Sequence, residues 1–217
     1  MRFPNAYKGV KKLFIAEVVG IVACLLIVVS SILFAAGIKN TAVLARSAGV
    51  ALAGSIALVV VFIISLVGLY QGGQDNDSIK CAFYLTLAAL LLSLLAAVFS
   101  AITKVEALVV AAKYINIAVD LATVIALEYT LFGISALAKQ LGNDKMASLG
   151  KTLAWSVFAL FALSIVLGLF GNIISNNTQE WVGTVVAVTS IVAGVLELIV
   201  YIAVVVYYGK STKMLKK

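Results

Sequence analysis

Six long apolar stretches alternate with short polar segments along the chain. The stretches are Leu13–Ile38, Gly49–Tyr70, Cys81–Ile102, Ala107–Ala138, Thr152–Ile174 and Trp181–Tyr208. A helix needs about 20 mainly apolar residues to cross the hydrocarbon core of a bilayer. The segments between the stretches are too short to hold a soluble domain, so residues 1–217 are expected to form a single six-span domain. The pattern predicts an all-α integral membrane protein, a six-transmembrane-helix bundle built as three hairpins.

Composition agrees with the bilayer as the solvent of this chain. Hydrophobic residues make up 64% of it and charged residues only 12%, whereas soluble domains are about 45–50% apolar and about 25% charged. These values exclude a disordered chain, a disulfide scaffold and an ordinary soluble enzyme. The two cysteines, Cys24 and Cys81, fall in different apolar stretches, and we expect two free, packed thiols.

The basic residues predict the orientation in the membrane. With both termini in the cytoplasm, the inner segments hold Arg2, Lys8, Lys11, Lys12, Lys80, Lys139, Lys145, Lys151, Lys210, Lys213, Lys216 and Lys217. The outer segments then hold only Lys39, Arg46 and Lys104. This bias follows the positive-inside rule and predicts a multi-pass protein of the plasma membrane with both termini inside.

Both ends of the chain are basic. Residues 1–12 combine lysines with aromatic residues at helical spacing, which predicts a short interfacial helix or a simple topology anchor. The tail 209–217 is rich in lysine. The net charge of +7 predicts contact with anionic headgroups at the cytoplasmic face and not with nucleic acid.

A weak threefold repeat is a further prediction. Lys12, Lys80 and Lys151 each precede an odd-numbered span, and they lie about 70 residues apart. Gly72, Gly142 and Gly209 follow the even-numbered spans at a similar interval. Short loops alone produce much of this regularity, because lysine and glycine collect at the ends of spans.

The fourth stretch holds most of the polar side chains within the spans. At 100° per residue, one arc of about 140° contains every member of a stripe on its helix. The members are Lys113, Asn116, Asp120, Thr123 and Glu128. Because a charge at the bilayer centre costs about 2.5–3.5 kcal/mol on insertion scales, the stripe is expected to face protein, water or a partner.

The sixth stretch carries one further acid, Glu197, with Tyr201 one helical turn beyond it. The tyrosine is placed to donate a hydrogen bond to the glutamate. Asp120, Glu128 and Glu197 are therefore the candidate proton, cation or solute site, supported by Lys113, Asn116, Thr123 and Tyr201. The alternative is a set of structural acids held by hydrogen bonds within the protein or to another subunit.

Small residues form ladders that predict close helix packing. The third stretch has Ala89, Ser93, Ala97 and Ala101 at intervals of four, and the second has Gly49 and Ala53 continuing to Ala57. These faces are expected to pack inside the bundle or between copies of the chain.

The sequence lacks the residues that several kinds of catalytic and metal sites require. The chain has no histidine, which removes imidazole-based hydrolysis and the common zinc sites. No nucleotide-binding glycine motif occurs. We expect no catalytic activity, no cofactor and no metal site.

Three functions remain open. The first is a transport protein, or the membrane subunit of a transporter, whose intramembrane carboxylates bind or couple a proton, cation or small solute. The second is a non-catalytic scaffold or assembly subunit that forms homo-oligomers, or joins other membrane subunits, through its small-residue faces. The third is a protein that binds anionic lipids or shapes the membrane through its basic ends.

Overall fold

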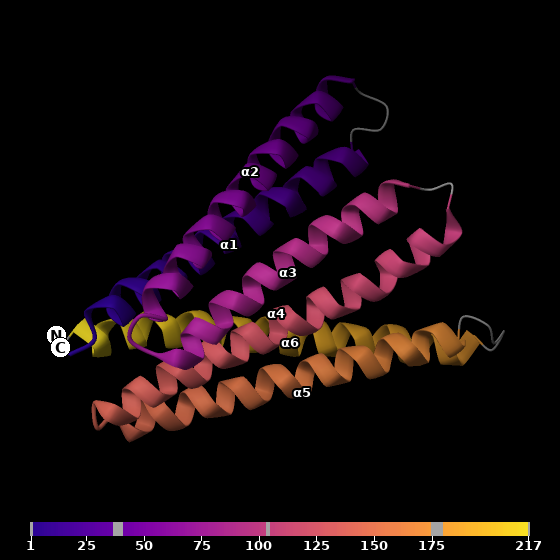
Figure 1. Ribbon diagram of the computed structural model, residues 1–217. Helices are drawn as coiled ribbons and strands as arrows, with labels where there is room; N and C mark the ends of the chain where they lie inside the picture. Colours follow the sequence, from indigo (N-terminus) through magenta and orange to yellow (C-terminus); the bar gives the residue numbers. More distant parts are fainter. Residues whose placement is uncertain (1, 37–40, 103–104, 175–179, 217) are drawn as a thin grey trace. The chain divides into compact units, whose positions relative to one another are not determined.

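A computed structural model describes residues 2–36, 41–102, 105–174 and 180–216. Over these residues the chain forms six helices and no strand (Figure 1). The helices are α1 (Pro4–Ala36), α2 (Thr41–Gly72), α3 (Asp77–Ala101), α4 (Glu106–Gln140), α5 (Asp144–Ile174) and α6 (Glu180–Lys216). All six are long and apolar enough to cross a membrane. Over the described residues, the prediction of an all-helical chain with six long apolar helices is confirmed, and the chain has the features of a multi-pass membrane protein.

The helices extend beyond the predicted spans. Helix α1 begins at Pro4 and passes without a break through the basic segment into the apolar stretch. Proline suits this first helical position because its missing N–H has no partner there in any case. Helix α2 begins at Thr41, so most of the predicted connection 39–48 is helical. Residues 37–38, the end of the first predicted stretch, lie outside the described residues. Residues 103–104, the start of the third predicted connection, lie outside them as well.

The connections before α3 and before α5 each end in an asparagine that caps the following helix. The Asn76 side chain accepts a hydrogen bond from the Ile79 backbone N at 3.2 Å, and Asn143 accepts one from Met146 N at 3.2 Å. Asparagine at this position satisfies an amide that the first turn of a helix leaves without a partner. These caps make the connections shorter than the predicted segments 71–80 and 139–151.

Helix α4 ends in a Schellman motif. Gly142 has φ of +71°, a left-handed conformation that glycine adopts without a steric penalty. The Asn143 N–H donates to Ala138 O at 2.9 Å, and the Gly142 N–H donates to Lys139 O at 3.0 Å. The chain can therefore stop one helix and start the next within three residues.

The chain divides into two compact units. Unit 1 comprises Met1–Asp75 and Tyr208–Lys217, and unit 2 comprises Asn76–Tyr207. Helix α6 thus contributes most of its length to unit 2 and its last turns to unit 1.

In unit 1, α1 and α2 form an antiparallel hairpin with close backbone contact (Figure 1). A Cβ atom placed on Gly9 would lie 2.5 Å from both Gly68 O and Gly72 N. At the other end of the hairpin the Ser30 hydroxyl donates to Ser47 O at 2.8 Å. Glycines at intervals of four allow this approach, as in other membrane helix pairs.

In unit 2, α4 lies between α3 and α5 and contacts both. A Cβ atom on Gly133 would lie 2.5 Å from the Ile79 side chain on α3. On the side toward α5, the Ser135 hydroxyl donates to Ala147 O at 2.6 Å. The buried side of α3 repeats mainly at sevens, through Ile79, Ala82, Ala89 and Ala96.

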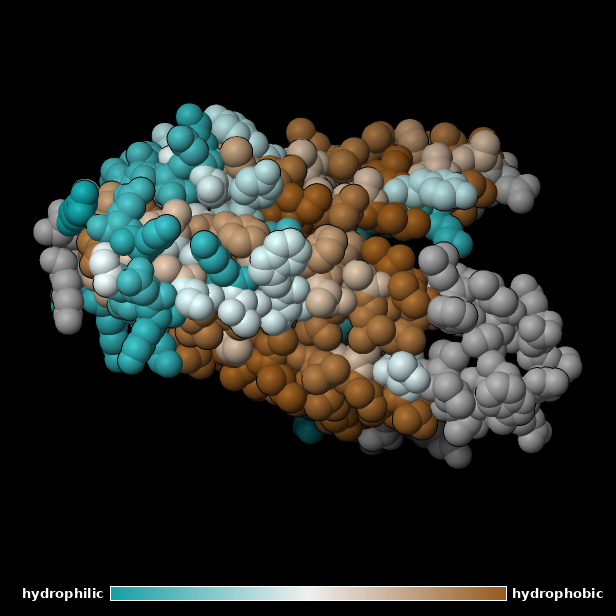
Figure 2. Space-filling view, turned by 90° about the horizontal axis from the view of Figure 1, so that it is seen from below, coloured by the Kyte–Doolittle hydropathy of each residue, from teal (hydrophilic) through white to brown (hydrophobic). Residues whose placement is uncertain are grey.

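Large apolar side chains remain exposed along all six helices. Figure 2 shows apolar residues over much of the helix surface and hydrophilic residues gathered at helix ends. Tyr70 is exposed near the end of α2, and Tyr84 and Trp155 are exposed two to three turns into α3 and α5. Cys24 and Cys81 are both free, as predicted, but both are exposed. The prediction that they are packed is wrong, because both side chains are exposed on the surface of their helices.

Candidate functional site

The polar stripe of α4 lies on the surface of its helix. Lys113, Asn116, Asp120 and Thr123 are all exposed in the part of the chain that the structure describes. Thr123 donates its hydroxyl hydrogen to Val119 O on its own helix at 2.8 Å. The structure thus brings these four residues to one helix face, as the helical spacing predicts, and leaves that face open.

Glu128, the last member of the stripe, has different surroundings. Its side chain is half-buried, and its Oε1 atom is buried without a hydrogen-bond partner. Ser135 lies two turns further along α4, at nearly the same angle about the helix, and contacts α5 at Ala147. Glu128 therefore belongs to the side of α4 that packs toward α5.

Glu197 on α6 has a partner on another helix. The Ser164 hydroxyl on α5 donates to Glu197 Oε1 at 2.5 Å. This distance lies at the short end of the range for O–H···O hydrogen bonds. The bond holds an ionisable side chain in a defined position within the apolar length of α5 and α6.

Ser164 is a site residue that sequence reasoning missed. The fifth stretch contains Ser156 and Ser164 in similar apolar surroundings, and nothing in their spacing distinguishes them. In the structure, Ser156 donates to Thr152 O of its own helix at 2.9 Å, whereas Ser164 reaches α6. Tyr201, predicted to assist Glu197, is half-buried one turn further along α6.

The three candidate acids do not meet in one cluster. Among the described residues, no group of three or more aspartate, glutamate or cysteine side chains is placed to hold a metal ion. Asp120 is exposed on α4, Glu128 is on the side toward α5, and Glu197 bonds to Ser164. Separate carboxylates of this kind can exchange a proton or contact one monovalent cation at a time.

The predicted packing ladders are only partly buried. Ala89 is buried and Ser93 half-buried on α3, while Ala97 and Ala101 are exposed. Gly49 and Ala53 on α2 are exposed as well, and a Cβ atom on Gly49 would meet nothing within 4 Å. The close contacts of unit 1 are made instead by Gly9, Gly54 and Gly68.

Asp75 is a second residue that the sequence did not single out. Its carboxylate accepts hydrogen bonds from Asn5 N at 2.9 Å, Ala6 N at 2.7 Å and Asn5 Nδ2 at 3.1 Å. The aspartate thereby caps the first turn of α1 from a position 70 residues away along the chain. A negative charge is favoured there by the partial positive charge of a helix N-terminus.

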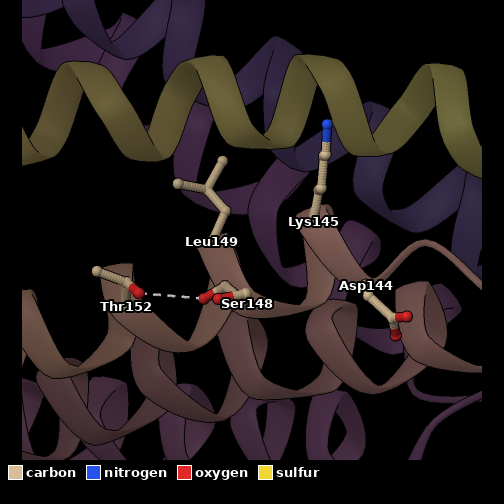
Figure 3. Close-up of a pocket in the computed structure, with 5 residues that line it drawn as sticks. All are labelled: Asp144, Lys145, Ser148, Leu149 and Thr152. Carbon is tan, nitrogen blue, oxygen red and sulfur yellow. Dashed lines mark hydrogen bonds between the residues drawn. The ribbon is translucent and has the colours of Figure 1, made fainter.

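The first three turns of α5 border a shallow hollow (Figure 3). It is lined by Asp144, Lys145, Ser148, Leu149 and Thr152. The Thr152 hydroxyl donates to Ser148 O at 3.2 Å, so it is occupied by its own helix. None of the predicted site residues lines this hollow, and its open form gives a ligand little enclosure.

Comparison with known proteins finds no family model that matches the chain, no similar curated protein and no similar solved structure. The function therefore has to be argued from the geometry of the site.

Proposed function

We propose that the protein is a membrane transport protein, or the membrane subunit of a transporter, whose intramembrane carboxylates bind or couple a proton, a cation or a small solute. The observation that carries the proposal is the 2.5 Å hydrogen bond from Ser164 to Glu197. An acid within an apolar span is costly and marks a functional site by default. Here a hydroxyl from another helix also fixes its position.

The open polar stripe of α4 supports the same function. Lys113, Asn116 and Asp120 are polar side chains exposed on an otherwise apolar helix. Polar side chains within spans are retained where they line a path for water, ions or solutes. Asp120 is therefore assigned a role in the path and Glu197 a role in coupling, with Glu128, Thr123 and Tyr201 as supporting residues.

The proposed setting is a single six-span domain in the plasma membrane with both termini in the cytoplasm. Twelve basic residues would then lie inside and three outside, in accordance with the positive-inside rule. In this proposal the protein is not an enzyme and uses no cofactor. The matching caps at Asn76 and Asn143 support a repeated hairpin design.

Proton flux into proteoliposomes tests the transport function. The purified chain is reconstituted with a pH-sensitive dye inside the vesicles, and an imposed pH gradient is followed with and without sodium or potassium. We expect Glu197→Gln to lower the flux about tenfold, because a hydrogen bond to a charged group is worth about 1.5–3 kcal/mol. Ser164→Ala should lower it in the same direction.

Ser156→Ala is the matched control, since it removes a hydroxyl from the same helix that bonds only to its own backbone. Its flux should stay within about twofold of the wild type. Wild-type vesicles that pass neither protons nor monovalent cations faster than empty vesicles would overturn the transport proposal. Equal losses in Ser156→Ala and Ser164→Ala would remove the role given to the Ser164–Glu197 bond.

A non-catalytic scaffold is the second candidate, and exposed small residues favour it. Ala53 and Ala97 lie on open helix faces that another copy of the chain could approach closely. In a scaffold, Ala53→Trp and Ala97→Trp would reduce the oligomer mass measured in mild detergent. Leu52→Trp, at an exposed position beside Ala53, is the control. A wild-type chain that is monomeric under these conditions rules this candidate out.

A further inference from the structure

Two basic helix ends pack together in unit 1. Helix α1 carries Lys8, Lys11 and Lys12 in its first turns, and α6 carries Lys210, Lys213 and Lys216 in its last turns. A Cβ atom on Gly209 would lie 3.1 Å from the Phe14 ring, so the end of α6 lies directly against α1. We call these six residues the α1–α6 lysine surface.

Most of the lysines are exposed, whereas apolar residues of the same helix ends are buried. Val10, Leu13 and Leu215 are buried, and Leu13 also lies against Gly68 of α2. Of the six lysines, only Lys12 is half-buried, and the other five are exposed. Each helix end is therefore amphipathic, with its ammonium groups free to meet a ligand.

The positive charge of this surface is not neutralised within the described part of the chain. None of the six ammonium groups has a hydrogen-bond or ion-pair partner among the described residues. Asp75, an acid of the same unit, is engaged by the backbone of Asn5 and Ala6. Six like charges on two neighbouring helix ends repel one another, so a polyanionic partner would relieve the repulsion.

The chemistry of the neighbouring residues identifies the partner. Directly after the lysines, α1 exposes Ile15, Val18 and Val22, which are side chains suited to lipid tails. The lysines thus lie where the headgroups of the same lipids would be. Lysine is a point charge that needs no fixed ligand geometry, and each one near an anionic membrane surface adds to lipid attraction.

We propose that the α1–α6 lysine surface is a binding site for anionic phospholipid headgroups. The phosphate groups of several lipids bind to the exposed lysines at the start of α1 and at the end of α6. The corresponding helix ends of unit 2 differ, because Lys80, Lys139 and Lys151 occur there with Asp77 and Asp144 nearby in the sequence. Those lysines therefore serve as a matched control for charge alone.

Lipid retention by the full-length chain tests the proposal. The purified protein in an uncharged detergent is titrated with phosphatidylglycerol or with phosphatidylcholine of the same acyl chains, and bound lipid is counted by native mass spectrometry. We expect tighter binding of phosphatidylglycerol, by about tenfold or more, that weakens as salt is raised. The triple variant Lys210→Gln, Lys213→Gln, Lys216→Gln should lose most of this preference.

Two further variants separate a site from a general charge effect. The triple variant Lys80→Gln, Lys139→Gln, Lys151→Gln should change the preference by less than about twofold. The triple variant Lys210→Arg, Lys213→Arg, Lys216→Arg should retain it, and this result would also show that the fold tolerates changes at these positions. Equal retention of both lipids by the wild type, or equal losses in the two glutamine triples, would overturn the proposal. Displacement of phosphatidylglycerol by an equal concentration of inorganic phosphate would overturn it too, because the site would then recognise phosphate without a membrane.

Discussion

At the scale of single residues, the Asp75 carboxylate stabilises the first turn of α1. Asp75 accepts three hydrogen bonds from the first turn of α1. Without it, two backbone amides at the helix start lose their acceptor. This dependence makes Asp75 a sensitive probe of unit 1.

Asp75→Ala is expected to destabilise unit 1 by about 1–2 kcal/mol, the usual cost of losing a helix cap. The loss should be seen as faster hydrogen exchange at the Asn5 and Ala6 amides and as a lower unfolding temperature in detergent. Asp77→Ala is the control, because Asp77 is exposed and only favours the dipole of α3. If both variants exchange alike at Asn5 and Ala6, the Asp75 cap has no energetic role.

Replacing Glu128 is expected to raise the stability of the protein, whereas replacing Asp75 is expected to lower it. Its Oε1 atom is buried without a hydrogen-bond partner, and an unsatisfied buried polar atom costs about 1–3 kcal/mol. Glu128→Met keeps the length of the side chain and removes the polar atom, so the unfolding temperature should rise. In the flux assay the same variant should be slower than the wild type, since functional polar groups are often retained at the expense of stability. A variant that is less stable would show that the carboxylate is satisfied.

At the scale of helices, contact between α1 and α2 depends on backbone atoms. Gly9→Ala would place a methyl group 2.5 Å from Gly68 O and Gly72 N, and neither backbone atom can turn aside. The two helices would have to move apart, at a cost of about 1–3 kcal/mol in unfolding free energy.

Gly49→Ala on α2 supplies the contrast. Its added methyl group meets nothing within 4 Å, and alanine is a better helix former than glycine by about 0.8–1.0 kcal/mol. Thermal unfolding in detergent should therefore show a loss for Gly9→Ala and a small gain for Gly49→Ala. The reverse order would mean that the close approach of α1 to α2 is absent in the membrane.

The helices could be predicted from the sequence, but their contacts could not. Uninterrupted apolar runs predict all six helices, because no other secondary structure satisfies its backbone in lipid without partners. Helix ends were less accurate, since polar residues such as Lys8 and Arg46 continue a helix when they project into headgroups or water. In the sequence, Gly9 and Gly68 resemble any other glycine near the end of an apolar stretch. Only the structure shows that they face each other and allow α1 and α2 to approach closely.

For the candidate site too, the positions of residues on one helix could be predicted, but their contacts with other helices could not. The spacing of Lys113, Asn116 and Asp120 placed them on one face, because the period of a helix is local. Whether another helix covers that face, and whether Glu197 finds Ser164, depends on residues far away in the sequence. No local pattern contains that information.

At the scale of the whole molecule, the two cysteines report how the chain lies in the bilayer. Both are free and exposed, yet Cys24 is deep in α1 and Cys81 is near the start of α3. In single-cysteine variants, a membrane-impermeant maleimide should label Cys81 from the cytoplasmic side only. Cys24 should stay unlabelled until the membrane is dissolved, because thiols react as thiolates in contact with water. Labelling of Cys81 from outside would reverse the proposed orientation.

The composition of unit 1 also has a consequence for biosynthesis. This unit joins Met1–Asp75 to Tyr208–Lys217, two segments that lie far apart in the sequence. A ribosome makes a protein from its N-terminus at about 5–20 residues per second, so α1 reaches the membrane long before the segment that packs against Phe14 exists. Helix α1 therefore gains its contact with Gly209 only after α6 has been made, and a premature stop that removes the final turns of α6 would leave Phe14 without that contact.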